Sequence, residues 1–261
     1  MAADNAFKLA PAIFSDLTKF ISPSALEVAD LSGIGGLVSS LSFRLLTSSG
    51  VSKVQRALEP SLTGIEAAKK LPHTLEDQLN NEELNDEQKQ QAADHLINLY
   101  FLQLLNPEGL FIDVRPKNLW LNTDSGSLVF KPSSAWLKFK PGFSDGLSQL
   151  YTGFYKGDEE LFEQGLRVLK LVPKHETEAN FQEIKNLFKN HFGKNLTATT
   201  FSLSVFYESF HQIFEFFKRE KVTLSADFVV LGMLLTTLYV SLEQLGRAIN
   251  VQKLYLATIE S

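Results

Sequence analysis

The stretch that decides the expected fold reads Gly109-Leu110-Phe111-Ile112-Asp113-Val114-Arg115-Pro116-Lys117-Asn118-Leu119. Before it, apolar residues recur at the spacing of one helical face, at Ala93, Leu96, Ile97, Tyr100, Phe101 and Leu104. Asn106-Pro107-Glu108-Gly109 should end that helix. After it, Leu119–Leu121 and Ser127–Lys131 are predicted strands joined by a turn at Asp124-Ser125-Gly126. The sequence therefore predicts a helix, a loop and a small hairpin, in that order.

Within this stretch, Asp113 and Asn118 have the D-x-x-x-x-N spacing of a kinase catalytic loop. In such a loop the carboxylate accepts the proton of the acceptor hydroxyl, and the asparagine oxygen reaches a metal ion. The spacing alone is common. The preceding helix and the following hairpin strengthen it, because a kinase C-lobe has the same order of elements.

The first 91 residues show mixed patterns. Residues 5–21 have helical spacing, whereas Leu41, Phe43 and Leu45 alternate with polar residues, which is typical of a strand. Residues 47–50 should form a turn and residues 51–56 a returning strand. Residues 57–91 are polar and contain an acidic run, which we interpret as a solvated face or a linker, with a surface for a basic partner as the alternative.

Helical patterns dominate the rest of the chain, at residues 147–155, 159–171, 178–192, 202–218 and 226–248. We therefore expect a mainly α protein with a small β component. The expected division is an N-terminal part at 1–91 and a helical domain at 92–261. A Phe-rich stripe between Val205 and Phe217 is interpreted as core packing, with an isoprenoid or lipid pocket as the alternative.

Composition excludes several classes of function. The net charge is −5 for 261 residues, without a sustained basic run, which argues against nucleic acid as a partner. The absence of Cys excludes disulfides and thiolate chemistry, and the five His show no metal-ligand spacing. The apolar run 228–242 is shorter than the roughly 20 residues of a membrane span, so it predicts a buried core helix. The start of the chain does not resemble a signal peptide, and we expect a cytoplasmic protein without a transmembrane segment.

A second catalytic pattern is Gly142-Phe143-Ser144-Asp145-Gly146, which fits the G-x-S-x-G turn of serine hydrolases. His175, His191 and His211 follow it in usable order. Because no strand of a parallel sheet is predicted downstream, we interpret this turn as the start of a helix.

The sequence resembles the AarF/UbiB family of atypical kinase-like proteins over roughly residues 92–250. That family has a helix, a G-F-F-H-A-D-P-H-P-G-N-L run, a D-G turn and a strand ending in D-F-G. Gly109–Leu119, the turn at Asp124–Gly126 and Ser127–Lys131 match these parts, and Leu242–Arg247 is similar to an L-E-x-x-x-R stretch of the closing helix. The family's phosphate-pairing lysine would fall weakly on Lys53, within Gly50–Arg56. The resemblance implies a protein-kinase-like C-lobe with a reduced N-terminal part, and a role tied to quinone and isoprenoid lipids.

Several family positions are changed in this chain. The loop histidines fall on Phe111 and Arg115, the Gly before the Asn is Lys117, and the D-F-G triplet falls on Pro132-Ser133-Ser134. Kinases need the metal-holding Asp and the Lys–Glu pair together, and residual Asp113 and Asn118 cannot replace them. Lys117 or Lys131 would be the substitute cation if phosphate binding persists.

These observations lead to one expected function and two alternatives. We expect a catalytically inactive, kinase-like binding or regulatory module that uses no cofactor and binds a protein partner or an apolar lipid. One alternative is a residual ATP-dependent phosphotransferase or ATPase. The other is a helical lipid-binding protein. For Asp113 itself, the non-catalytic alternative is a structural carboxylate that caps the loop or pairs with Arg115 or Lys117.

Overall fold

The computed structural model describes residues 27–47, 50–193 and 198–260. The chain is mainly helical with small sheets, as predicted. It separates into two compact units, each assembled from separate parts of the sequence. We call the described residues within Ser48–Lys138, Asn195–Leu203 and Thr237–Ser261 the sheet unit, and those within Met1–Thr47, Phe139–Lys194 and Ser204–Thr236 the helix unit.

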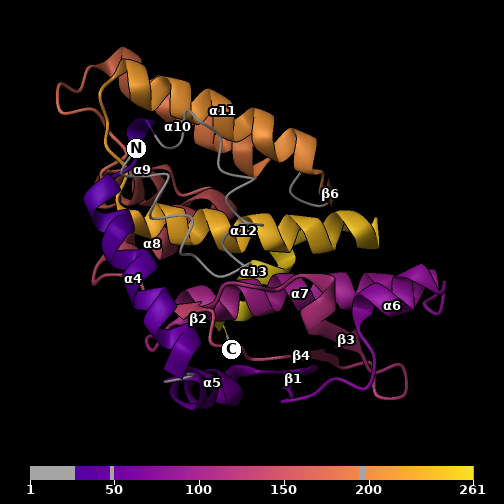
Figure 1. The fold of residues 1–261 in the computed structure, drawn as a ribbon. Helices are drawn as coiled ribbons and strands as arrows, with labels where there is room; N and C mark the ends of the chain where they lie inside the picture. Colours follow the sequence, from indigo (N-terminus) through magenta and orange to yellow (C-terminus); the bar gives the residue numbers. More distant parts are fainter. Residues whose placement is uncertain (1–26, 48–49, 194–197, 261) are drawn as a thin grey trace. The chain divides into compact units, whose positions relative to one another are not determined.

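The sheet unit holds the small strands around one long helix (Figure 1). Its elements are α5 (Val51–Leu58), the 3-10 turn η1 (Glu59–Ser61), β1 (Ile65–Ala67), α6 (Leu75–Asn80), α7 (Asp86–Leu105), β2 (Leu110–Phe111), the 3-10 turn η2 (Pro116–Asn118), β3 (Leu119–Leu121), β4 (Leu128–Phe130), β5 (Trp136–Leu137), β6 (Thr199–Thr200), β7 (Ala248–Ile249) and α13 (Val251–Glu260).

Helix α7 is the centre of this unit, and its predicted apolar face is buried: Ala93, Leu96, Ile97, Tyr100, Phe101 and Leu104. Its start is a capping box, in which the Asn85 side chain accepts from the backbone N–H of Gln88 and the Gln88 side chain accepts from that of Asn85. The helix ends at Leu105, where the sequence predicts its end.

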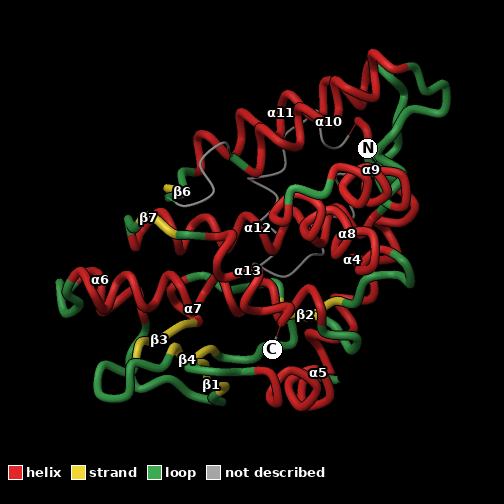
Figure 2. Tube along the Cα trace, turned by 180° about the vertical axis from the view of Figure 1, so that it is seen from behind, coloured by secondary structure: helices red, strands yellow, loops and turns green. Residues whose placement is uncertain are grey.

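The three-stranded sheet has the order β1-β4-β3 (Figure 2). The β3–β4 hairpin is antiparallel, with Leu119 opposite Phe130, which confirms the predicted strands and turn. Strand β1 was not predicted and joins β4 in parallel. On the open edge of β3, the buried Gln78 side chain donates to the carbonyl of Leu121 at 2.9 Å and accepts from its N–H at 3.0 Å, so one amide replaces a neighbouring strand.

The predicted hairpin at residues 41–56 is wrong. Leu31–Thr47 forms helix α4, and Val51–Leu58 forms helix α5, while residues 48–49 lie outside the described part of the chain. Phe43, which the alternation assigned to a buried strand face, is 63% exposed. In α5 the buried pair is Val54 and Leu58, four residues apart, which is a helical spacing. The predicted helix at 5–21 also lies outside the described residues.

The acidic run is solvated, as predicted, but it is not a linker. Glu76 and Asp77 lie in the first turn of α6, and Asp86 and Glu87 in the first turn of α7. Carboxylates at these places are favoured because the amino end of a helix carries a partial positive charge. The run therefore helps to start two helices.

The helix unit contains α4 (Leu31–Thr47), α8 (Phe143–Lys156), α9 (Glu159–Val168), α10 (Glu178–Phe192), α11 (Leu203–Arg219) and the first part of α12 (Ala226–Leu245). Helices α8 to α12 confirm the predicted helical segments, whereas α4 was not predicted, and two further differences lie at the end of the chain. Gly246 has a φ of 64° and ends α12 three residues before the predicted end. Beyond it, β7 and α13 were not predicted.

Helix α12 is 20 residues long, and by length and composition it is the one described helix that could cross a membrane. The 15-residue apolar run lies within it, and Ala226–Asp227 and Glu243–Leu245 extend the helix at the two ends of the run. In the protein 61% of its most apolar window is buried, and buried hydroxyls lie along it at Thr236, Thr237 and Ser241.

Helices α8 and α9 pack with their backbones almost in contact, because each has a glycine at the crossing. A Cβ atom on Gly153 would lie 2.3 Å from the backbone nitrogen of Phe162, and one on Gly165 would lie 2.6 Å from that of Leu150. Real Cβ atoms do not approach backbone so closely, so only glycine permits this pairing.

Aromatic rings fill the contact between α10 and α11. His191 lies among Phe192, Phe206 and Phe210, with its ring centroid 4.3 Å from that of Phe210. Its Nδ1 is 2.9 Å from the hydroxyl of Ser209. Because that hydroxyl donates to the carbonyl of Phe206, it accepts from His191, which fixes the neutral tautomer with the proton on Nδ1. The predicted core stripe of α11 is thus largely packed, although Val205 is 62% exposed.

Gly153→Ala should lower the free energy of unfolding by several kcal/mol, at least as much as overpacking a core usually costs. The added Cβ would meet the backbone of α9, which cannot shift as easily as a side chain. Gly232→Ala is the matched control, because its Cβ would meet no atom within 4 Å. The control should be neutral or stabilise α12 by about 1 kcal/mol. Urea unfolding of both variants measures the difference, and equal effects would contradict the tight crossing.

His191 should make stability depend on pH. Burial lowers the pKa of His191 from its ordinary 6.5 to about 4, so the unfolded chain binds a proton at pH values where the folded chain does not. Folding stability should therefore be fully present above about pH 6.5 and fall as the pH drops toward 4, by at most about 3 kcal/mol. His191→Phe should flatten this part of the pH profile of unfolding, whereas the exposed His175→Gln should leave it unchanged.

Candidate functional site

The loop from Ile112 to Asn118 runs from β2 to β3, and α12 fixes its backbone. The hydroxyl of Thr237 donates to the carbonyl of Ile112 at 2.9 Å, and the hydroxyl of Ser241 donates to that of Val114 at 2.7 Å. Thr237 and Ser241 are both fully buried. Because they are four residues apart, they lie on one face of the helix and meet alternate residues of the loop.

The entry to the loop is held from α7. The buried Gln103 side chain accepts from the backbone N–H of Phe111 at 2.6 Å. Strand β2 then pairs with β5 in antiparallel fashion, with Phe111 opposite Trp136. The loop is therefore anchored by a strand pair at its start and by hydroxyl groups along its length.

Asp113 lies at the centre of the loop, and Arg115 occupies both of its carboxylate oxygens. Arg115 donates from Nε to Oδ1 and from Nη2 to Oδ2, each at 2.7 Å. The side chain of Asp113 is 1% exposed and that of Arg115 is 13% exposed. Such a two-point pair is the strongest form of carboxylate–guanidinium contact, and it corresponds to the structural alternative that the sequence left open for Asp113.

Asn118 lies beside Asp113, but its side chain turns to the loop backbone. Its Nδ2 donates to the carbonyl oxygen of Asp113 at 3.3 Å. The backbone carbonyl of Asn118 accepts from the N–H of Lys131 at 2.9 Å, which extends the β3–β4 ladder by one pair. The two residues of the motif are thus brought together, and Asn118 braces the loop.

Lys53 lies on α5 and not on a strand. Its ammonium group is 2.6 Å from the carboxylate of Glu108, and its side chain is 67% exposed. This hydrogen bond from Lys53 lowers the pKa of the Glu108 carboxyl. No described interaction connects Lys53 with Asp113 or Asn118, whereas α5 itself is attached to the end of α7 through a hydrogen bond from Asn106 to the carbonyl of Val54.

Lys117 is exposed within η2, next to Asn118. Lys131 is exposed as well, and its backbone pairs with that of Asn118. The segment after Lys131 is Pro132-Ser133-Ser134, where the hydroxyl of Ser133 accepts from the N–H of Ala135. This segment offers hydroxyl groups but no carboxylate. Among the described residues, no group of three or more His, Asp or Glu side chains could hold a metal ion.

Ser144 of the G-x-S-x-G pattern lies in the first turn of α8, after Gly142, whose φ of 82° places it in the left-handed region. This position agrees with a helix start.

Sequence reasoning missed the polar residues that hold the loop in place. Thr237 and Ser241 carried a signal, since they interrupt the most apolar run of the chain at a spacing of four. Gln78 and Gln103 carried none, because an amide on a helix gives no indication of which backbone group it will bind.

No protein-family model matches the chain, and no curated protein matches it at a significant level. The kinase-like resemblance of the sequence therefore remains a prediction.

The Asp113–Arg115 pair should be strongly coupled. Arg115→Met leaves a buried carboxylate without its partner and should cost about 3 kcal/mol of stability, as should Asp113→Ala. The double variant should cost less than the sum, with a coupling energy of about 2 kcal/mol from the unfolding free energies. The exposed Lys53–Glu108 pair is the control, and its cycle with Lys53→Met and Glu108→Gln should give less than about 1 kcal/mol. Equal coupling in both cycles would contradict the role of burial.

Proposed function

We propose that this chain is a catalytically inactive, kinase-like module that acts by binding, with a protein or an apolar lipid as its partner. The observation that carries the proposal is the pairing of Asp113 with Arg115. A general base must offer a carboxylate oxygen to the proton it removes. In this loop both oxygens are already bound to a guanidinium group that is permanently charged.

The order of elements supports the kinase-like part of the proposal. Helix α7 is followed by β2, the Asp113–Asn118 loop and the β3–β4 hairpin, and a kinase C-lobe has the same order of helix, loop and hairpin. Helices α8 to α12 come after them in the chain. A frame of this kind hosts many functions, so the proposal rests on the loop and not on the frame alone.

The chemistry of the residues after β4 supports the inactive part. In a phosphoryl-transfer enzyme a carboxylate at this place binds magnesium, which neutralises the charge that develops on the phosphate. Pro132, Ser133 and Ser134 cannot supply that charge. Removing one preorganised electrostatic group usually costs about 3 to 4 kcal/mol of barrier, and here Asp113 is engaged as well.

The position of Lys53 supports the same conclusion. A phosphate-pairing lysine is held by a glutamate and points at the nucleotide. Lys53 does have a glutamate partner, Glu108, which lies in the turn after α7, but the Lys53 side chain is 67% exposed. Exposed pairs of this kind contribute little energy and are screened by salt. The proposed link with quinone or isoprenoid lipids rests on the family resemblance.

A thermal-shift titration with ATP, with and without magnesium, tests the proposal. A competent nucleotide site at a hundred times its dissociation constant would add about 2.7 kcal/mol to the unfolding free energy. We expect no magnesium-dependent stabilisation and no phosphotransfer to added protein or lipid acceptors. A magnesium-dependent shift that disappears in Asn118→Ala would show a working site and overturn the proposal. The readout is the shift on adding ligand, so a lower starting Tm of the variant does not affect it.

A further inference from the structure

Four exposed lysines meet at one end of the three-stranded sheet: Lys69, Lys70, Lys117 and Lys131. The register of the strands brings them together. Strand β1 runs parallel to β4, with Ala67 opposite Phe130, and the N–H of Ala68 continues the ladder to the carbonyl of Phe130. Lys69 and Lys70 therefore leave β1 where Lys131 leaves β4.

Lys117 joins the same end from the other side. Strand β3 is antiparallel to β4, so its beginning lies beside the end of β4. The hydrogen bond from the Lys131 N–H to the Asn118 carbonyl pairs these two residues, so Lys117 lies one residue away from the pair. Neighbouring strands are about 4.8 Å apart, so long lysine side chains leaving three adjacent segments can reach one ligand.

The nearby carboxylates do not neutralise this cluster. None of the four lysines has an ion pair among the described residues. Asp113 is bound by Arg115, and Asp77 of α6 accepts from the hydroxyl and N–H of Thr74. Glu66 of β1 is the adjacent exposed carboxylate. It lies opposite Val129, which is two residues before Lys131 in the chain.

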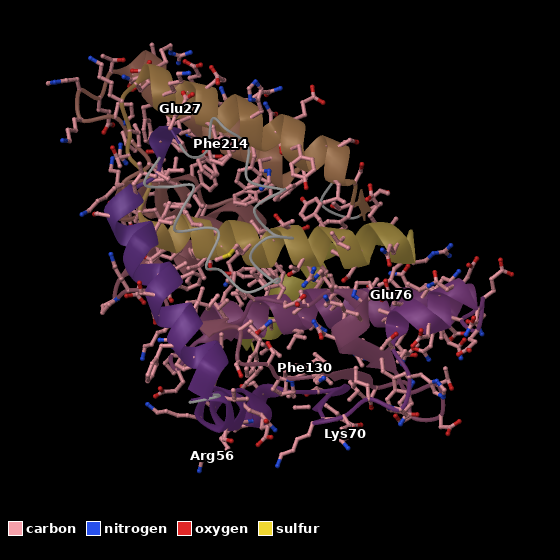
Figure 3. The ribbon with its side chains drawn as sticks, viewed as in Figure 1. Glu27, Arg56, Lys70, Glu76, Phe130 and Phe214 are labelled. Carbon is pink, nitrogen blue, oxygen red and sulfur yellow. The ribbon has the colours of Figure 1, made fainter. Side chains whose placement is uncertain are left out.

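The cluster faces solvent, while the opposite side of the sheet belongs to the core. Phe130 packs against Phe111 with ring centroids 5.9 Å apart. In Figure 3, Lys70 extends from β1 on the side away from α7. Like charges on adjacent segments repel one another, although water screens exposed groups, and an anion between them turns this repulsion into attraction. The chain as a whole is acidic, with a net charge of −5, so overall composition does not account for this basic patch.

We propose that Lys69, Lys70, Lys117 and Lys131 form a binding site for a ligand with two or more phosphate groups, without a metal ion. Lysine ammonium groups bind phosphate as point charges, and here they would provide the positive charge that magnesium brings to other phosphate sites. The ligand's phosphates come either from a soluble polyphosphate or nucleotide, or from a phosphorylated lipid headgroup. The inference uses only strand register and charge, so it stands apart from the proposed kinase-like function.

Titration calorimetry with tripolyphosphate and ATP in magnesium-free buffer containing EDTA tests the soluble source. Co-sedimentation with phosphatidylcholine vesicles, with and without phosphatidylinositol bisphosphate, whose headgroup carries several phosphates, tests the lipid source. Lys70→Gln/Lys131→Gln should weaken binding of the preferred source about tenfold. Lys174→Gln/Lys253→Gln is the matched control, because it changes the net charge equally at exposed sites elsewhere and should leave the affinity unchanged. Glu66→Gln should strengthen binding slightly.

Binding of either source that follows this pattern supports the site and identifies the source. Failure of both sources to bind overturns the inference, as does an equal loss in the two double variants. Binding of ATP that requires magnesium and ignores the lysine substitutions also overturns it, and would in addition contradict the proposed inactive loop. Retained Tm values of these surface variants confirm that the fold is intact.

Discussion

The arrangement of the loop depends on the charge of Asp113 being met inside the protein. The Asp113 side chain is 1% exposed, and burying a charged carboxylate is costly unless a group of opposite charge forms hydrogen bonds with it. Arg115 supplies this partner two residues along the chain, with two parallel hydrogen bonds. The pair is therefore local in sequence, with Val114 between the two residues. In this pairing each oxygen of the carboxylate accepts a hydrogen bond from Arg115.

Other parts of the sheet unit hold this loop in place through hydrogen bonds from their side chains. Helix α12 has the apolar surface of a core helix, and its hydroxyl groups at Thr237 and Ser241 bond to the loop carbonyls. Side-chain amides bind backbone groups at the strand edges in the same way. Gln78 binds the backbone of Leu121 in β3, and Gln103 accepts from the N–H of Phe111 in β2. Buried backbone groups without partners are costly, so short strands of two or three residues need these polar side chains from helices.

The helical part of the fold could be predicted from the sequence because its signals are local. Asn106 and the apolar positions of α7 mark its end and its buried face within one segment, whereas its start at Asp86 lies in the stretch that was predicted as a solvated face or a linker. The prediction failed at residues 41–56, where a short alternation of Leu, Ser and Phe satisfies a strand and a helix equally. There Leu41 is buried and Phe43 is 63% exposed, although the alternation placed both on one strand face. Strand β1 was missed for a related reason, since three residues form a strand only when β4 is beside them.

For the candidate site, the sequence by itself determined the chemical groups: the five-residue spacing of Asp113 and Asn118, the hydroxyl groups of Ser133 and Ser134 after β4, and the lysines at 69, 70, 117 and 131. Only the tertiary structure decided which groups are occupied and which are free. Arg115 could have pointed to solvent, and Lys69 could have been far from Lys117, because charge and spacing along a chain say nothing about direction. Strand register and burial settle direction, since each is a relation between segments that no single segment contains.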